Sequence, residues 1–253
     1  MSRRAPSKRR ALLLAVLLSG AATPASAQQA LGVLATTCGP LDANRSLPVD
    51  TTAAVPARAV VVASVVGNGV VLDDLVLVDP ASASYTAIGA RRTRATAKLG
   101  VAQLFAPVVS AVPAGSRFTL RAVAAPPGTS VCVSLAAFTD VAVGAAAMQS
   151  RAAAGGNNAA PALTGDRNGD GTPQLLLGSF AFAADPSGFA TAQPGIVATS
   201  ACDAAQTLCI GTLAGNDAGG GALALGATLG TAVNWSGVLA SLDRDSMFKD
   251  GFE

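Results

Sequence analysis

The sequence predicts an all-β protein, an antiparallel β-sandwich of jelly-roll-like form, that follows a cleaved signal peptide. Apolar runs of strand length recur along the chain, and Gly, Pro, Asn, Asp and Ser separate them. No segment after the first 27 residues keeps a long helical period with caps. Many short strands separated by turn signals are typical of a sandwich or a barrel.

The amino terminus has the three parts of a secretory signal. It begins with five basic residues, Arg3, Arg4, Lys8, Arg9 and Arg10. The apolar run 11–18 follows, and then the small-residue cleavage site Ala25-Ser26-Ala27. This run is too short for a bilayer span, which takes about 20 residues. We therefore expect 1–27 to be removed and the rest to be exported to the periplasm or the cell exterior. General secretion is the expected route, and the twin-arginine route is the alternative, because Lys8-Arg9-Arg10 resembles a twin-arginine signal.

Cleavage at this site leaves 12 basic and 15 acidic residues, a net charge of −3. A nucleic-acid partner needs a basic surface, so we expect none. The basic cluster 91–94 with Lys98 lies between apolar runs and is interpreted as a solvated loop or strand face. A hydrophobic content of 51% argues against disorder, and an aromatic content of 4% argues against a groove built for ring stacking.

Four cysteines in an exported chain predict two disulfides. Three pairings are possible. We favour Cys202 with Cys209, which closes a short loop, and Cys38 with Cys132, which ties the first strand region to a mid-chain strand. A zinc site is the alternative, but the chain has no histidine and the cysteines stand alone.

Ten strands are expected, in chain order, and the alternation of apolar residues supports several of them. In each of three expected strands, a group of residues should share one face. The groups are Val131, Val133 and Leu135; Phe118 and Leu120; and Val233, Trp235 and Leu239. The expected strands are Arg58–Val66, Val70–Val78, Lys98–Phe105, Arg117–Ala124, Ser130–Thr139, Gln174–Ala183, Gly195–Ser200, Thr207–Leu213, Ala222–Leu229 and Ala232–Leu242.

The connections complete the expected organisation: one sandwich domain over 28–242 and a polar tail over 243–253. Gly67-Asn68-Gly69 predicts a hairpin between the first two expected strands. The Ala-rich segment 143–154 predicts a helical turn that ends at Gly155. The stretch 155–170 is interpreted as the connection between two halves of one sandwich rather than as a domain linker.

The most specific local signal is Asp166-x-Asn168-x-Asp170-Gly171. It puts three oxygen-bearing side chains on alternate residues of a tight loop, as a hard cation such as calcium requires, and resembles the loop-then-strand calcium sites of extracellular repeats. Gln174 and Leu177 stand where a complete loop carries further acidic ligands. The sequence therefore predicts either a weak calcium site at Asp166, Asn168 and Asp170 or a polar turn before a buried strand.

Catalytic sites find little support. Without histidine, Ser-His-Asp and Cys-His arrangements are excluded, as are His-ligated metal centres. Glu253 is the only glutamate, and Asp73-Asp74, the one adjacent acidic pair, would point to opposite faces of a strand. Ser246-x-x-Lys249 matches a short catalytic motif but has no partner motifs around it. We expect no enzyme activity.

A family resemblance rests on six apolar segments in one order: Arg58–Val66, Tyr85–Gly89, Gln103–Ala106, Val131–Phe138, Gln174–Phe180 and Trp235–Ala240. Their order resembles that of lectin-like jelly-roll surface modules of bacteria and phages. The resemblance covers most of the chain after the signal and implies the fold, but it has no functional residue to carry over. The ending Phe248-Lys-Asp-Gly-Phe252-Glu253 resembles a short tail on secreted proteins of some Gram-negative bacteria, which implies sorting or surface retention. The alternative is a frayed polar terminus.

Together these features predict a secreted, non-catalytic β-sandwich that acts in adhesion, surface display or carbohydrate contact. A calcium-stabilised extracellular binding module is the second hypothesis, and an Asp-based hydrolase the third. A glycan or a cell-surface polymer is the expected partner. The ligand and the oligomeric state are left open.

Overall fold

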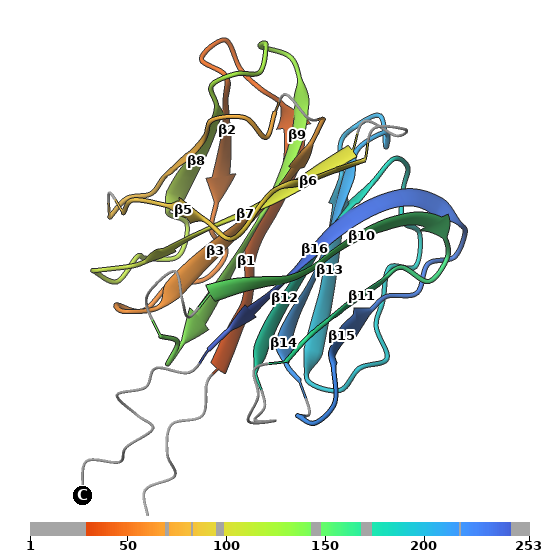
Figure 1. Ribbon diagram of the computed structural model, residues 1–253. Coiled ribbons are helices and arrows are strands. Elements are labelled where there is room, and N and C mark those ends of the chain that lie inside the picture. Colours follow the sequence, from red (N-terminus) through yellow and green to blue (C-terminus); the bar gives the residue numbers. More distant parts are fainter. Residues whose placement is uncertain are drawn as a thin grey trace, which may run out of the picture.

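The computed structural model describes residues 29–68, 71–81, 83–94, 99–142, 148–167, 174–217 and 219–243. Within these ranges every regular element is a β-strand, so the all-β fold class is confirmed (Figure 1). None of the described residues forms a helix with the length and apolarity needed to cross a membrane. The strands are β1 (Gln29–Pro40), β2 (Ser46–Asp50), β3 (Val60–Gly67), β4 (Leu75–Val78), β5 (Thr86–Ala87), β6 (Arg92–Arg94), β7 (Leu99–Pro107), β8 (Arg117–Ala122), β9 (Ser130–Thr139), β10 (Met148–Asn158), β11 (Ala162–Gly165), β12 (Leu175–Phe182), β13 (Ile196–Cys202), β14 (Cys209–Asn216), β15 (Leu223–Gly226) and β16 (Val233–Leu242).

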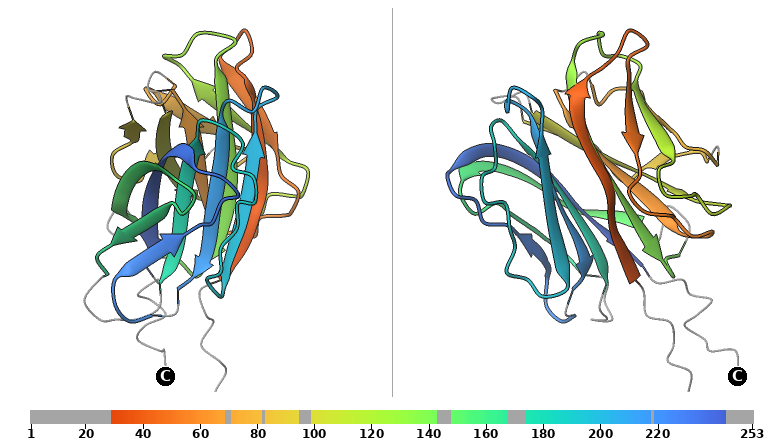
Figure 2. Two further views of the ribbon diagram at one scale, coloured as in Figure 1. Left: turned by 90° about the vertical axis from the view of Figure 1, so that its right-hand side faces the viewer. Right: turned by 180° about the vertical axis from the view of Figure 1, so that it is seen from behind.

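The strands form four antiparallel sheets in four layers (Figures 1 and 2). Main sheet N has the order β1-β9-β3-β7-β5, with β6 also paired to β7, and cover sheet N has the order β2-β8-β4. Main sheet C has the order β10-β16-β12-β14-β13, and cover sheet C is β11-β15. The two main sheets pack face to face in the middle of the molecule, and each cover sheet lies on the outer face of its own main sheet.

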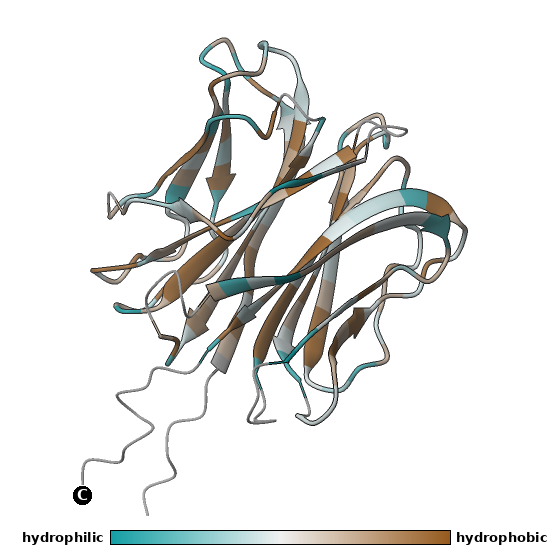
Figure 3. Ribbon diagram, viewed as in Figure 1, coloured by the Kyte–Doolittle hydropathy of each residue, from teal (hydrophilic) through white to brown (hydrophobic). Residues whose placement is uncertain are grey.

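The central strands are buried on both faces, which explains their continuous apolar sequences. On β3, alternate residues face cover sheet N (Val61, Ala63, Val65) and main sheet C (Val60, Val62, Val66). On β12, alternate residues face cover sheet C (Leu176, Phe180, Phe182) and main sheet N (Leu175, Leu177, Ala181). Figure 3 shows hydrophobic residues gathered on these middle strands. The one-face groupings expected for Val131, Phe118, Trp235 and their neighbours are confirmed.

The N-terminal half (β1–β9) and the C-terminal half (β10–β16) repeat the same pairing. The strand order β1-β9-β3-β7 in main sheet N corresponds to β10-β16-β12-β14 in main sheet C. A register shift between Val33 and Ala35 on β1 recurs between Ser150 and Ala152 on β10, at the corresponding place in each ladder. The two halves are therefore topological copies.

The halves meet where equivalent residues face each other. Ser64 is the fifth residue of β3 and Ser179 the fifth residue of β12, and their hydroxyl oxygens lie 2.6 Å apart in the buried interface. The Gln103 side-chain amide donates to Ser179 Oγ (2.7 Å) and to the carbonyl oxygen of Leu177 (3.2 Å). A small polar network thus lies between the apolar clusters that join the two main sheets.

Three local predictions were wrong. The Gly67-Asn68 turn joins strands of different sheets, because β3 pairs with β7 and β9 whereas β4 pairs with β8, so no hairpin forms. Residues 148–154 of the predicted helical turn belong to β10, and 143–147 lie outside the described residues. The stretch 155–170, interpreted as the connection between two halves, contains the end of β10 and all of β11 in its described part, 155–167. In each case a long-range partner strand overrides a local propensity.

Candidate functional site

The predicted calcium loop begins directly after β11. Asp166 is the first residue beyond that strand, and its side chain is exposed. Asn168 and Asp170, the other two predicted ligands, lie outside the described residues. In the described ranges no group of three or more Cys, Asp or Glu side chains is placed to hold a metal ion. The calcium site therefore stays a prediction.

Asp217 holds both flanks of this loop. The Arg167 guanidinium forms a bidentate ion pair with Asp217, and the backbone N–H of Gln174 donates to Asp217 Oδ1 (2.8 Å). Both charged side chains are largely buried, with 7% and 11% of their surface exposed. Leu175 pairs with Asn216 at the end of the β12–β14 ladder, which is why Asp217 lies beside Gln174. Because Asp217 already neutralises Arg167, it anchors the loop rather than serving as a free metal ligand.

A groove of about 370 Å³ runs along β4, one of the two edge strands of cover sheet N. Its walls are the strand itself, Leu75–Val78, and the segment Ala83–Tyr85. Leu77 points into the core, whereas Val76 and Val78 are 44% and 46% exposed on the opposite face. The groove thus combines aliphatic surface with the hydroxyl groups of Ser84 and Tyr85 and the unpaired side of a strand.

Asp79 fixes the second wall of the groove. This buried carboxylate accepts hydrogen bonds from the backbone N–H of Ala83 (2.9 Å) and from the hydroxyl of Tyr85 (3.0 Å). Burial, followed by the charge and the hydrogen bond of Asp79, raises the pKa of Tyr85 above its ordinary value. Tyr85 is therefore a neutral hydrogen-bond donor across the physiological pH range.

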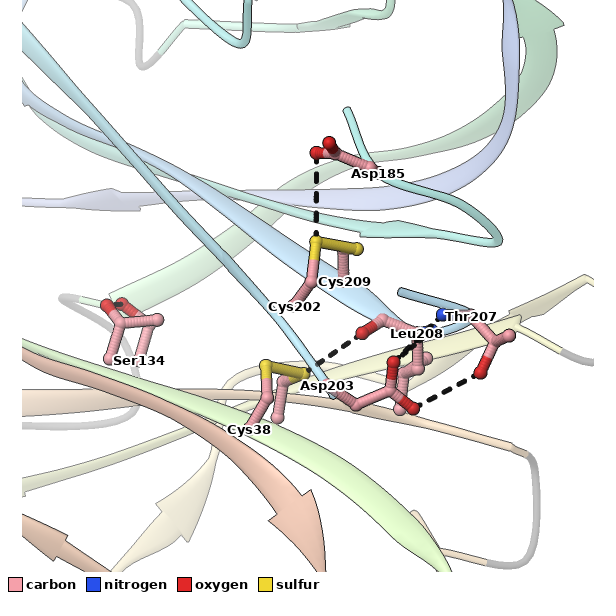
Figure 4. The surroundings of a disulfide bond; sticks show 10 residues. Cys38, Ser134, Asp185, Cys202, Asp203, Thr207, Leu208 and Cys209 are labelled. Carbon is pink, nitrogen blue, oxygen red and sulfur yellow. Dashed lines mark hydrogen bonds between the residues drawn. A yellow bond between two sulfur atoms is a disulfide. The ribbon is translucent and has the colours of Figure 1, made fainter. Parts of the chain in front are cut away.

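Both disulfides that the sequence favoured are present (Figure 4): Cys38–Cys132 lies between the main sheets, and Cys202–Cys209 lies on the face of main sheet C that cover sheet C covers. Cys38 and Cys132 are directly paired residues of β1 and β9, and Cys202 and Cys209 are directly paired residues of β13 and β14. Cys132 Sγ lies 3.6 Å from the carbonyl oxygen of Leu208, so the first bridge packs against the hairpin that the second one closes. The described residues contain no free cysteine.

Asp203 organises that hairpin. Its carboxylate accepts hydrogen bonds from the backbone N–H groups of Thr207 (2.8 Å) and Leu208 (3.2 Å) and from the Thr207 hydroxyl (3.2 Å), as Figure 4 shows. Burial by itself would raise the pKa of Asp203, but these hydrogen bonds and one from the Ser130 hydroxyl outweigh it, so the pKa lies below its ordinary value. Ser130 belongs to the other half, so the hairpin also links the two halves.

Sequence reasoning missed the groove and all three anchoring carboxylates, Asp79, Asp203 and Asp217. Asp203 carried a usable signal, because an aspartate at the start of a short disulfide-closed loop commonly caps backbone N–H groups. Asp79 and Asp217 carried none, since their partners become neighbours only through strand pairing. A comparison with protein-family models, curated proteins and solved structures finds no match for this chain.

Proposed function

We propose that the chain is an exported, non-catalytic β-sandwich protein of adhesion or surface display, and that it contacts a glycan or another cell-surface polymer through the β4 groove. The groove carries the proposal. It offers aliphatic side chains, the Ser84 hydroxyl and a side of an edge strand that no other described strand pairs with, which suits an extended polymer.

The scaffold behind the groove supports this role. Two disulfides cross-link neighbouring strands, and such bridges persist mainly outside the cytoplasm. The wall that contains Tyr85 is held by a buried carboxylate, so the groove is preformed and loses little entropy when a ligand binds.

An array of glycans and surface polymers, probed with the protein lacking residues 1–27, tests the proposal. Val76→Asp adds a charge to the groove at a position that is already exposed, and we expect at least a tenfold loss of binding. Val109→Asp is the matched control, because Val109 is 79% exposed and lies outside the groove. Failure to bind any polymer, or equal binding by both variants, would contradict the proposal, as would turnover in a hydrolase screen.

The second candidate is a calcium-stabilised binding module. The observation that favours it is the anchoring of both flanks of the 168–173 segment to Asp217, next to the exposed carboxylate of Asp166. Ends held in place reduce the ordering that a cation must impose.

Calcium is tested by thermal unfolding. We expect a dissociation constant on the order of 10⁻⁴–10⁻³ M, so millimolar calcium should raise the melting temperature relative to chelator. Asp166→Asn and Asp170→Asn should each reduce that rise, because each removes one ligand charge. An identical melting curve with calcium and with chelator would make the loop only a polar turn before β12.

A further inference from the structure

We propose that the free edge of β13 is a dimerisation surface, on which β13 of a second copy of this chain pairs in antiparallel fashion. β13 is the outermost strand of main sheet C, and β14 is its one partner strand in the described part of the chain. All seven of its residues stay in regular register with β14. A regular edge is the kind of strand that accepts another strand.

The disulfide at the end of β13 shows which backbone groups face outward. The Cα atoms of Cys202 and Cys209 lie 4.0 Å apart, the close spacing of a pair that does not exchange backbone hydrogen bonds. The N–H and C=O groups of Cys202 therefore point away from β14. Because the pattern repeats every second residue, those of Ser200 and Ala198 also point to the free edge.

Other edges of the described sheets carry protection that β13 lacks. β1 has two register shifts, and the carbonyl oxygen of Leu34 accepts bonds from the N–H (2.8 Å) and the hydroxyl (2.6 Å) of Thr52. β10 has one register shift. β4 has only four residues. β13 contains no charged residue and no proline, and its Val197 is 54% exposed. Charge, proline, bulges and short length are the usual means of blocking an edge.

The repeat supplies an internal comparison. In the N-terminal half, β5 and β6 lie on β7 where β13 lies on the equivalent strand β14. They are two and three residues long, and β6 carries the exposed Arg92. The strands at this position are therefore short and charged in the N-terminal half, whereas β13 in the C-terminal half is long and uncharged.

A second copy fits this edge in a self-complementary way. In an antiparallel pair centred on Thr199, Ala198 of each copy lies opposite Ser200 of the other, and all four residues direct their backbone groups toward the partner. The two five-stranded main sheets C then form one sheet across the twofold axis. β1, which runs alongside β13 (Figure 2), is also uncharged and exposes Leu31, so these two strands bring no charged side chain to the contact. One strand pair is a small interface, and we expect micromolar affinity.

Sedimentation velocity of the protein lacking residues 1–27, over about 1–300 μM, is the test at this affinity. We expect a monomer–dimer equilibrium. Val197→Lys places a charge on the edge, and Ser200→Pro removes an outward N–H, so each should weaken the dimer at least tenfold. Val109→Lys adds the same charge at an exposed valine outside the edge and should leave the equilibrium unchanged.

Two results would overturn the proposal. One is a wild-type protein that stays monomeric over the whole concentration range. The other is association that Val197→Lys and Ser200→Pro leave intact, which would place the contact on another surface. Circular dichroism of both edge variants separates loss of pairing from loss of the fold.

Discussion

Tyr85 is the only tyrosine in the chain, so its ionisation can be followed directly by absorbance. Burial and the neighbouring carboxylate of Asp79 raise its pKa in the folded state above the ordinary value of 10.0. The neutral phenol therefore contributes stability that is fully present below about pH 10 and is lost as the pH rises further.

An alkaline titration monitored at the tyrosinate band tests this prediction. We expect no tyrosinate near pH 10 while the far-ultraviolet circular dichroism remains native, and a rise only when the protein unfolds. Protein unfolded in urea is the control and should titrate at about pH 10. A native protein that titrates with the control would show that the bond to Asp79 does not form.

Asp203 acts in the opposite pH range. Hydrogen bonds hold its pKa below the ordinary value despite burial, so its carboxylate contributes stability above about pH 4 that is lost as the pH falls through the folded-state pKa. Asp203→Asn should reduce the free energy of unfolding at pH 7 by about 1.5–3 kcal/mol. In acid the difference between the two proteins should narrow.

Urea unfolding of the wild type and of Asp203→Asn at pH 7 and pH 3 measures this difference in the free energy of unfolding. Asp50→Asn is the control, because Asp50 pairs with Arg117 on the surface and should have little effect at either pH. A deficit of Asp203→Asn that stays constant with pH would mean that side-chain shape, rather than charge, stabilises the hairpin.

Among the elements, the double-sided central strands were the most predictable. β9 was predicted residue for residue, and β3, β7, β12, β14 and β16 differ from expectation by at most three residues at either end. Their apolar runs follow from burial on both faces. The cover and edge strands β8, β13 and β15 were also predicted within three residues, whereas β1, β2, β5, β6, β10 and β11, which are half exposed or rich in small or polar residues, were missed.

The candidate sites divide in the same way. The cysteine pairs followed from count and spacing, whereas the calcium loop at Asp166, predicted from alternating oxygen-bearing side chains, stays a prediction. The β4 groove had no local signature, because its two walls are separate segments brought together by Asp79. The ion pair of Arg167 with Asp217 had no local signature either, because the two residues are 50 positions apart in the sequence.

At the scale of the whole molecule, the buried network of Ser64, Ser179 and Gln103 joins the two halves. Ser179→Ala should lower the free energy of unfolding by about 1–3 kcal/mol, because it leaves the Ser64 hydroxyl and one bond of Gln103 without a partner. The double variant with Ser64→Ala should lose less than the sum of the single losses, by about 0.5–1.5 kcal/mol.

Denaturant unfolding of the wild type, the two single variants and the double variant gives the coupling energy between Ser64 and Ser179. Thr212→Val is a suitable control, since Thr212 Oγ1 is buried in the same interface and has no hydrogen-bond partner within the described chain. Its replacement should be neutral or stabilising. Additive losses for the two serines would show that their contact contributes nothing to the packing of the halves.

The bridge between Cys38 and Cys132 has a mechanical consequence for a protein that is pulled by its two ends. β1 begins and β16 ends at the same end of the molecule (Figure 1), so tension applied there reaches the sulfur bridge once the first part of β1 has peeled away. The 94 positions that the bridge spans would extend by about 310–340 Å if they could unravel.

Single-molecule stretching should show an unfolding length shorter by about this amount, 310–340 Å, in oxidised than in reduced protein. Equal lengths would mean that the bridge does not bear the load. With the bridge intact, the covalent bond rather than the ladder between β1 and β9 resists the pull, and the residues between Cys38 and Cys132 cannot be extended until the disulfide is reduced.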